Sequence, residues 1–403
     1  MSGDPQAGEW IDAAAAAERL GVKPATLYAY VSRGVLRRRR GDDGRRSLFE
    51  AAQVEELARR GRPRRPPGPG ELAIESAITA LGPDRPYYRG RDALELAAAH
   101  RFEEVAGWLW TGDLAARDGW TAPPDGLAAA VAAQSGLAAG ALPLDRLQLI
   151  ATALGVADPA RHRLDPGAVT ATARALIAGL VEALPALSGD EAERTIAGRL
   201  WARLTPRRAE PGLLRALETA MILLADHELA ASTVAARVAA SVRADPYAVV
   251  AAGLGVLGGP LHGGASYAAE RLLAEIGDDP ARAARVLGER LRGGERVPGF
   301  GHQVYKQGDA RAGHLLAVLR DAAPGRLAAL DAVLAEAARL RLPEPNIDLV
   351  VAALGGAAGM VPGAGEAVFA VARTAGWLAH AAEEYERRAP LRPRAVYTGP
   401  PPA

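Results

Sequence analysis

We predict an all-α fold for this chain of 403 residues, because its composition and its residue patterns both favour helices. Apolar residues make up 49% of the chain and aromatic residues only 5%, so alanine and leucine must build most of the core. Ala- and Leu-rich segments with apolar residues at helical spacing are interrupted at glycine and proline, as in 92–111, 213–242 and 366–388. The alternation of apolar and polar residues that is typical of strands is scarce.

The distribution of charge divides the chain into two parts. Residues 1–70 contain 14 Lys and Arg against 9 Asp and Glu, whereas the remaining residues contain 34 against 38. Between the two parts lies the segment RRGRPRRPPGPG, which cannot propagate a helix and is typical of a semi-rigid linker. We therefore expect a basic N-terminal domain over residues 1–60, a linker over 61–71 and a large helical domain over 72–403.

The N-terminal domain is predicted to contain two short helices joined by a turn. Asp12 can cap a first helix that ends at Gly21, and Pro24 suits the first turn of a second helix that runs to about Arg33. The run RRRRGDDGRRSLF that follows is typical of a hairpin wing with basic strands. Two helices and a wing match a helix-turn-helix domain.

The run LGVKPATLYAYVSRG resembles the MerR-like winged helix-turn-helix domain. The resemblance implies that the second helix and the wing contact DNA. The candidate contact residues are Thr26, Tyr28, Arg33, Arg37, Arg38, Arg45 and Arg46. The alternative is a helical appendage for contacts with another protein, in which the arginine run is simply a solvated surface.

Several classes of protein are excluded by residue types that the chain lacks. It has no cysteine, which excludes disulfides, thiolate metal ligands and a cysteine nucleophile. The N-terminus MSGDPQAGEW has neither the basic start nor the apolar core of a signal peptide, and no apolar run reaches the ~18 residues of a membrane span. The net charge of +1 gives no argument for nucleic-acid binding by the chain as a whole. We expect a cytoplasmic protein without a membrane partner.

Four polar positions lie beside residues that end or begin helices and are candidates for chemistry. His227 closes an apolar run in LLADHELAAST, and His262 lies between two pairs of glycines in GGPLHGGA. His302 follows two glycines in PGFGHQVYKQGDAR, which leave room for backbone and ligands to approach. Asp348 precedes an apolar run, so it either caps that helix or lies in an apolar pocket that would raise its pKa. A metal site is not expected, because no two of these histidines have the spacing of metal ligands on one helix.

These motifs, in this order and at this spacing, resemble the citrate synthase family. The stretches that carry the resemblance are YYRGRDALELAAAHRFEEVAGWLWTGD, PLDRLQLIATALG, ADHELAASTVAARVAASVRADPY, GGPLHGGA, PGFGHQVYKQGDAR, PNIDLVVAAL and RPRAVYTG. The resemblance covers residues 72–403. It implies a large helical domain, a smaller domain near residues 250–350 that closes over the substrates, and a homodimer.

The family condenses an acyl-CoA thioester with oxaloacetate, and the resemblance implies a role for each candidate residue. Asp348 would be the base that removes the α-proton, His262 would donate to the thioester oxygen, and His302 would donate to the carbonyl of oxaloacetate. The residues implied to bind oxaloacetate are His227, Arg311, Arg373 and, from the partner subunit, Arg392. Lys306 matches a position that faces the phosphates of CoA. The resemblance implies no cofactor, with acetyl-CoA as a substrate.

The sequence also departs from the family pattern close to these residues. Gln303 stands where a basic residue is common, and Ala310 replaces the proline that usually precedes Arg311. Three functions therefore remain open. They are a citrate synthase that uses acetyl-CoA, a 2-methylcitrate synthase that uses propionyl-CoA, and a DNA-binding regulator whose citrate-synthase-like domain senses a metabolite.

Overall fold

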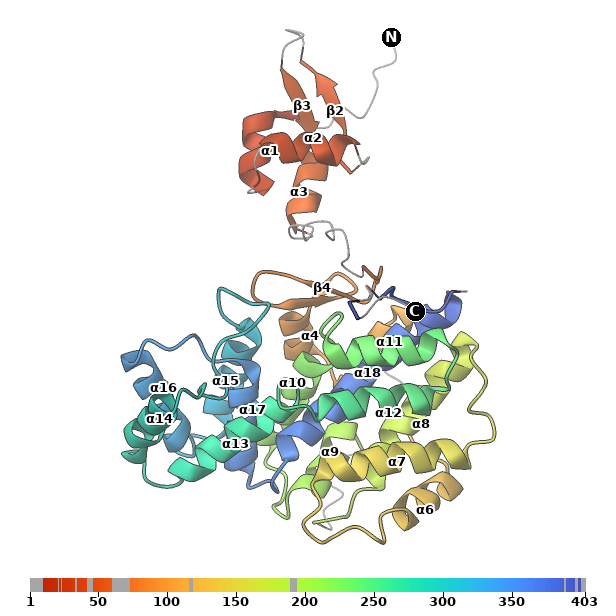
Figure 1. Cartoon of the computed structure of the whole chain (residues 1–403), viewed down its shortest axis with the longest axis vertical. Coiled ribbons are helices and arrows are strands. Elements are labelled where there is room, and N and C mark those ends of the chain that lie inside the picture. The colour runs from red at the N-terminus through yellow and green to blue at the C-terminus, as the bar shows by residue number, and fades with distance from the viewer. Residues whose placement is uncertain are drawn as a thin grey trace. The chain divides into compact units, whose positions relative to one another are not determined.

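Two compact units make up the chain, Met1–Ala73 and Ile74–Ala403, which we call the head and the helical unit (Figure 1). The computed structural model describes residues 10–20, 22, 24–32, 35–41, 46–59, 73–115, 119–188, 194–387, 389–395 and 398–399. The predicted linker, residues 61–71, lies outside the described residues, as do Arg33 and Arg45.

The head combines short helices with a three-stranded sheet. Its elements are β1 (Trp10–Asp12), α1 (Ala13–Leu20), α2 (Pro24–Ser32), β2 (Arg38–Arg40), β3 (Ser47–Glu50) and α3 (Ala51–Arg59). Asp12 caps α1 as predicted, because its Oδ1 accepts a hydrogen bond of 2.8 Å from the backbone N–H of Ala15. β2 and β3 form an antiparallel wing at the predicted place. The sequence did not indicate β1, which pairs with the other edge of β3, since three residues are too few to show alternation. Leu27, Phe49 and Val54 form the centre of the head's own core.

The helical unit confirms the prediction of a mainly helical fold. Its elements are β4 (Thr79–Leu81), β5 (Pro86–Tyr88), β6 (Arg91–Asp92), α4 (Ala93–Ala99), α5 (Phe102–Thr111), α6 (Pro124–Ala132), α7 (Pro143–Ala157), α8 (Pro166–Glu182), α9 (Ile196–Leu204), α10 (Pro211–Leu224), α11 (Ala231–Ser241), α12 (Pro246–Leu257), α13 (Gly264–Ile276), α14 (Arg282–Arg292), α15 (Ala310–Ala322), α16 (Ala328–Arg339), α17 (Ile347–Ala358) and α18 (Ala364–Glu386). Helices α6, α7, α8, α10 and α12 each begin with proline, whose missing N–H would have no partner in the first turn anyway. The small antiparallel sheet of β4, β5 and β6 was not predicted, because its strands are too short to show a pattern. None of the helices in the described ranges has the length and the apolar character needed to cross a membrane.

Helix α18 runs through the centre of the helical unit, and every residue from Ala364 to Ala381 is buried. Helices α10, α11 and α12 pack against it. Gly376 allows the closest approach, since a Cβ at this position would lie 2.5 Å from the carbonyl oxygen of Ala225. Four charged or ionisable polar side chains on this buried helix need polar partners inside the protein, namely Glu366, Arg373, His380 and Glu384.

Helices α13 to α17 form a group on one side of the helical unit (Figure 1). Within the group α13 packs against α17, α14 against α16, and α15 against α17, while α10 and α18 carry contacts to the rest. The group spans Gly264 to Ala358, whereas a smaller domain was expected near residues 250–350. The loop that carries His302 and the first turn of α17, which carries Asp348, both belong to this group.

Candidate active site

The loop that carries His302 is bonded to the segment that precedes α17. Asn346 donates from its backbone N–H to the carbonyl of Gly299 and from Nδ2 to the carbonyl of Gly301, both at 2.9 Å. Both glycines have left-handed backbones, with φ of 85° and 75°. A Cβ on Gly299 would lie 2.6 Å from the Cβ of Leu349. The sequence argument explained these glycines by ligand approach, but the conformation of the loop and its packing on α17 already require Gly299.

The hydrogen bonds of His302 define which ring nitrogen carries the proton. The backbone N–H groups of Val304 and Tyr305 donate to Nδ1 at 3.0 and 3.1 Å, so Nδ1 is an acceptor and we assign the proton of the neutral ring to Nε2. Nε2 also lies 3.4 Å from Nη2 of Arg311, a longer contact than the two bonds to Nδ1. Burial, with a smaller contribution from Arg311, lowers the pKa of His302 to about 4. The ring of Tyr305 stacks on the imidazole with a centroid distance of 4.5 Å. His302 is therefore a neutral donor held in one orientation.

Arg311 is buried beside His302 and paired with Asp309. Its Nε and Nη2 donate to the two carboxylate oxygens at 2.8 and 2.9 Å. Asp309 also caps α15 and accepts from the backbone N–H of Ile347 at 3.0 Å, which joins the starts of α15 and α17. Burial raises the pKa of Asp309, but the guanidinium of Arg311 outweighs it, so the pKa lies below its usual range. His227 lies against the same cluster, with its ring centroid 5.3 Å from that of His302.

His262 is oriented by a hydroxyl from α11. Ser232 Oγ lies 2.7 Å from Nε2 of His262, and the indole Nε1 of Trp377 donates to the same Oγ at 3.2 Å. An indole N–H can only donate, so it occupies one lone pair of the serine, and the hydroxyl proton and the second lone pair both remain available to His262. We assign the arrangement in which the hydroxyl donates to Nε2, so the neutral ring carries its own proton on Nδ1. Burial, together with the charge of Arg373, lowers the pKa of His262 to about 4.

The structure decides between the two placements considered for Asp348. Asn346 is the cap of α17, since its Oδ1 accepts from the backbone N–H of Asp348 at 3.1 Å. The carboxylate of Asp348 instead accepts a hydrogen bond of 2.7 Å from Ser266 Oγ on α13. Burial raises the pKa of Asp348 above its usual value, although the bond from Ser266 acts in the opposite direction. A carboxylate that is partly buried from water and has a raised pKa is suited to accept a proton.

Arg373 places a further cation in the centre of the unit. Its Nε donates to the carbonyl of Leu224 at 2.8 Å, and its guanidinium carbon lies 4.6 Å from the ring centroid of Phe369. The edge of the His262 ring meets the same phenyl ring at a centroid distance of 5.7 Å. Within the described residues, Nη1 of Arg373 is buried and has no hydrogen-bond partner. A buried cation with an unused donor is suited to bind an anionic ligand.

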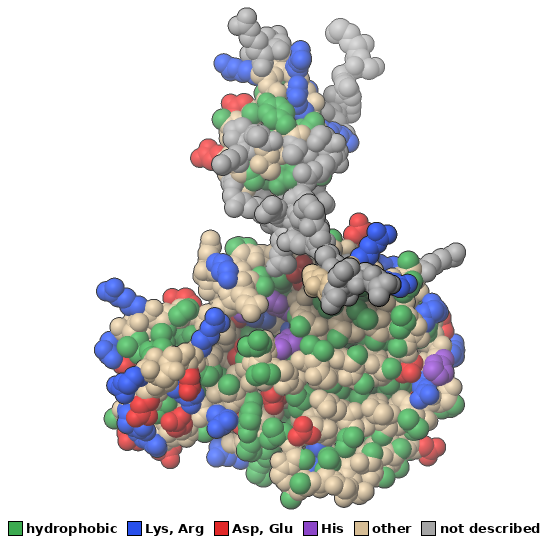
Figure 2. Space-filling model, in the orientation of Figure 1, with side chains coloured by type: hydrophobic (Ala, Val, Ile, Leu, Met, Phe, Trp, Pro, Cys, Tyr) green, Lys and Arg blue, Asp and Glu red, His purple; other side chains and the backbone are tan. Residues whose placement is uncertain are grey.

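The other two predicted residues lie at the surface. Lys306 is exposed, and its Nζ donates to the carbonyl of His302 at 3.4 Å. Arg392 is exposed on the C-terminal segment, which α11 holds through a hydrogen bond of 3.1 Å from the N–H of Leu391 to Ser241 Oγ. No hydrogen bond or ion pair joins Arg392 to the site residues within the described part of this chain. Histidine side chains are visible where the group of α13 to α17 meets the rest of the unit (Figure 2).

The sequence analysis missed the residues that orient the site. Ser266 lies in the first turn of α13, four residues after His262, but nothing in the local sequence indicates its bond to Asp348. Ser232 and Trp377 gave no local signal, because α11 and α18 meet only in the folded chain. In the described ranges, no group of three or more metal-binding side chains could hold a metal ion.

Comparisons with known proteins identify relatives of both units. The family description "Citrate synthase, C-terminal domain" matches residues 69–394, and "Helix-turn-helix domain" matches residues 10–62. Citrate synthase 2 of Bacillus subtilis is 32% identical to this chain over 362 residues, which cover 82% of this chain and 95% of the relative. The 2-methylcitrate synthase 1 of Corynebacterium glutamicum is 35% identical over 192 residues, which cover 46% of this chain and 50% of the relative.

Solved structures of similar fold cover the same part of the chain. A citrate synthase from Thermotoga maritima MSB8 has a TM-score of 0.67 at 27% identity, over 83% of this chain and 95% of that chain. A citrate synthase from Thermoplasma acidophilum, in a ternary complex with carboxymethyl coenzyme A and oxaloacetate, has a TM-score of 0.68 at 24% identity, over 82% of this chain and 95% of that chain. At that identity the second likeness concerns the fold alone.

Proposed function

The chain belongs to the citrate synthase family, and we propose that it condenses acetyl-CoA with oxaloacetate and water to citrate and CoA. The observation that carries the proposal is the arrangement of three groups. A carboxylate with a raised pKa, Asp348, lies in the same unit as two neutral histidines, His262 and His302, whose orientation is fixed by hydrogen bonds.

In the proposed first step, Asp348 accepts the α-proton of the thioester while the Nδ1–H of His262 donates to the thioester oxygen. The electron pair of the broken C–H bond moves toward that oxygen, which gains negative charge, and a neutral donor stabilises it. The enolate carbon then forms a bond to the carbonyl carbon of oxaloacetate. The Nε2–H of His302 donates to the carbonyl oxygen, which becomes the alcohol of the product. Water finally cleaves the thioester and releases the CoA thiol.

Oxaloacetate carries two carboxylates, and the site offers cations to match. Arg311 and Arg373 supply buried guanidinium groups, and the ring centroid of His227 lies 5.3 Å from those of both His302 and Tyr305. We assign the remaining contact to Arg392 of the partner subunit, since this residue is exposed in its own chain. Lys306 is assigned to the CoA phosphates.

A homodimer is part of this proposal. Helices α7, α11 and α12 pack side by side and show an apolar face with few charged side chains (Figure 2). Val156 at the end of α7 is 74% exposed, and Val242 beyond α11 is 66% exposed. Apolar residues exposed together on packed helices are typical of an interface between copies. Size-exclusion chromatography with light scattering measures the mass in solution, and a monomer at working concentration would contradict this part of the proposal.

The test of the proposed reaction is release of free thiol from acetyl-CoA in the presence of oxaloacetate. Asp348→Asn keeps the shape of the side chain but removes the base, so turnover should fall by roughly 10²–10⁴-fold. Asp331→Asn, on exposed α16, is the matched control and should leave turnover unchanged. Propionyl-CoA in a parallel assay separates the two enzymatic readings, because a higher kcat/KM with propionyl-CoA would favour a 2-methylcitrate synthase. If the wild-type protein turns over neither acetyl-CoA nor propionyl-CoA, the proposal is contradicted.

A second candidate function, DNA binding, rests on the head. On the wing, Arg38 lies 5.5 Å from the ring centroid of Tyr28, and Arg39 lies 4.6 Å from that of Trp10. Arg38 therefore presents an exposed guanidinium beside α2, whereas Arg39, the next residue of β2, lies beside β1 on the other face of the sheet. An exposed basic strand next to α2 suits a phosphate backbone. Fluorescence anisotropy with duplex DNA compares the full chain with a chain that starts at Glu71. Only the full chain should bind, with affinity falling steeply as salt rises, and equal negligible binding at low salt would favour the protein-contact alternative. DNA binding without turnover would instead favour a metabolite-sensing regulator.

A further inference from the structure

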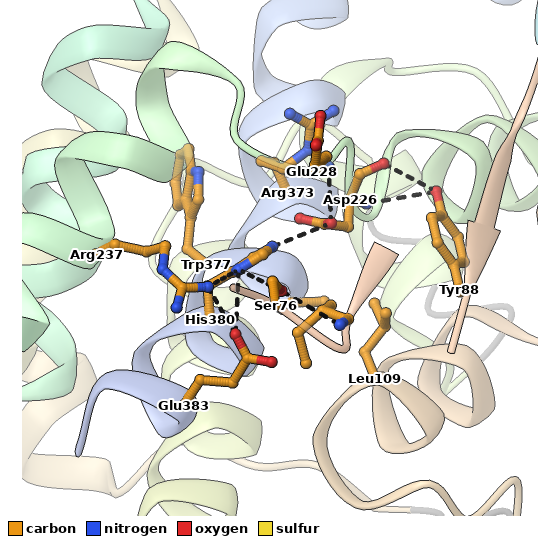
Figure 3. A network of polar contacts seen from close by, with 12 residues as sticks. Ser76, Tyr88, Leu109, Asp226, Glu228, Arg237, Arg373, Trp377, His380 and Glu383 are labelled. Atoms are coloured by element: carbon orange, nitrogen blue, oxygen red, sulfur yellow. Dashed lines mark hydrogen bonds and ion pairs between the residues drawn. The ribbon is translucent and has the colours of Figure 1, made fainter. Parts of the chain in front are cut away.

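A chain of buried polar side chains crosses the helical unit and ends at the turn that carries His227 (Figure 3). Its central member is His380 on α18, which is fully buried. His380 Nδ1 lies 2.6 Å from Nη1 of Arg237, and its Nε2 lies 3.2 Å from Oδ2 of Asp226. A guanidinium can only donate, so Nδ1 is an acceptor, and the neutral ring donates from Nε2 to the carboxylate.

The inner end of the chain holds a strained turn. Oδ2 of Asp226 also accepts from the backbone N–H of Glu228 at 3.1 Å, which closes a turn around His227. Glu228 has a φ of 53°, in the left-handed region that is unfavourable for a residue with a side chain. A tertiary contact must therefore keep the turn in place. Tyr88 also supports this turn, because its hydroxyl donates to the carbonyl of Asp226 at 3.2 Å.

The outer end of the chain is attached to the segment with which the helical unit begins. Arg237 is fully buried and donates to Glu383 Oε2 at 2.6 Å and to Glu384 Oε1 at 2.7 Å. The other oxygen of Glu383 accepts from the backbone N–H of Ala77 at 2.7 Å, and Arg237 also reaches the carbonyl of Glu75 at 3.3 Å. Residues 75–77 therefore follow the linker in sequence and form the outer anchor of the chain.

One face of α18 connects this chain with the candidate site. Arg373, Trp377, His380 and Glu384 recur every three or four residues and so lie on one side of the helix. Gly376 on the same side presses against the turn, since a Cβ there would lie 2.2 Å from Oδ1 of Asp226. Burial raises the pKa of Asp226, but the hydrogen bond from His380 and the charge of Arg373 outweigh it, so the pKa lies below its usual range.

We infer that Arg237, His380 and Asp226 form a positioning chain that fixes His227 for the binding of oxaloacetate, with residues 75–77 as its outer anchor. None of the three is a catalytic residue. The chain keeps the turn at Glu228 in its strained form, and thereby holds the imidazole of His227 beside His302 and Tyr305. The inference rests on the proposed function, because it names oxaloacetate as the ligand.

The test compares two substitutions of His380 in the full-length protein. The amide of His380→Asn ends near the position of Nδ1 and cannot reach Asp226, whereas the longer side chain of His380→Gln can place a donor near Nε2. A hydrogen bond to a charged group contributes about one to two powers of ten to an equilibrium. His380→Asn should therefore raise the KM and the calorimetric Kd of oxaloacetate roughly tenfold, with kcat and the KM of acetyl-CoA changed less than about threefold. His380→Gln should recover most of the affinity.

Tyr385→Phe is the matched control for stability. It removes a hydrogen bond of 2.7 Å from the same helix to the carbonyl of Ala244 but does not touch the positioning chain. It should lower the melting temperature and leave the KM of oxaloacetate unchanged. If His380→Asn also lowers only the melting temperature, with KM and Kd within twofold of wild type, His380 is merely structural and the inference is wrong.

Two further outcomes are decided by other measurements. If His380→Asn does not fold, Glu383→Gln loosens the outer anchor while leaving His380 in place, and an unchanged oxaloacetate KM in that variant overturns the inference. If the wild type binds oxaloacetate without turnover, the proposed reaction fails. The Kd values of the variants for oxaloacetate then still decide the role of the positioning chain. Absence of oxaloacetate binding by the wild type overturns both.

Discussion

Removing the hydroxyl of Ser266 should shift the pH dependence of the reaction toward higher pH. Ser266 Oγ donates to Oδ1 of Asp348 at 2.7 Å, and this bond lowers a pKa that burial raises. A hydrogen bond to a charged group contributes about 1.5–3 kcal/mol. Ser266→Ala should therefore move the pKa of Asp348 further above its usual value, and kcat/KM measured on the acid limb should fall by about one to two powers of ten.

The sign of the effect follows from the role of the base. Asp348 must be deprotonated to accept the α-proton, so activity is lost as pH falls through its pKa. A higher pKa moves this acid limb of the kcat/KM profile to higher pH. Activity at a pH well above the pKa of Asp348 in both the wild type and the variant should be retained, because the carboxylate is ionised there. A loss of activity that is equal at all pH values would instead indicate a displaced carboxylate.

The assay is thiol release at low acetyl-CoA with saturating oxaloacetate, measured across the pH range in which the protein stays folded. Thr170→Ala is the control, because its hydroxyl donates to the carbonyl of Pro166 in the first turn of α8 and makes no contact with Asp348. Its profile should match that of the wild type. An acid limb that does not move in Ser266→Ala would show either that Asp348 is not the titrating base or that the serine does not act on it.

Three further predictions concern the supports of the site. Ser232→Ala removes the hydroxyl that fixes the ring of His262, the proposed donor to the enolate, so kcat should fall by roughly tenfold while the KM of oxaloacetate stays the same. An unchanged kcat would contradict the assigned orientation. Gly376→Ala places a methyl against the inner end of the positioning chain and should raise the KM of oxaloacetate. Gly288→Ala, in a helix with open space around the new methyl, is the control and should not raise it. Equal KM values in the two variants would argue against the positioning chain. Arg392→Ala should weaken oxaloacetate binding by about 2–5 kcal/mol, and mixing it with Asp348→Asn protomers should restore activity, since one site of each heterodimer is intact. Lack of recovery despite measured subunit exchange would count against a shared site.

The sequence by itself was sufficient for the fold class and for the family. Ala- and Leu-rich segments broken at glycine and proline predicted a mainly helical chain, and the comparisons confirm both the citrate synthase resemblance and the helix-turn-helix resemblance. These predictions succeeded because helical periodicity and short motifs are local properties of a sequence. His227, His262, His302 and Asp348 were singled out as candidates for the same reason, since each lies in its own motif beside a helix end, and their roles stay predictions.

Only the tertiary structure decided how those residues are oriented and protected. The proton position on His262 depends on Ser232 and Trp377, which lie on two different helices that meet in the folded chain. The placement of the Asp348 carboxylate depends on Asn346, which caps the helix in its stead, and on Ser266, from a helix some eighty residues earlier in the chain. Such contacts arise when elements distant in sequence pack together and exclude water, so burial and hydrogen bonding set the pKa of a group that no local pattern describes. For that reason a sequence identifies the groups that carry chemistry, whereas the packing of the helices determines their charge and direction.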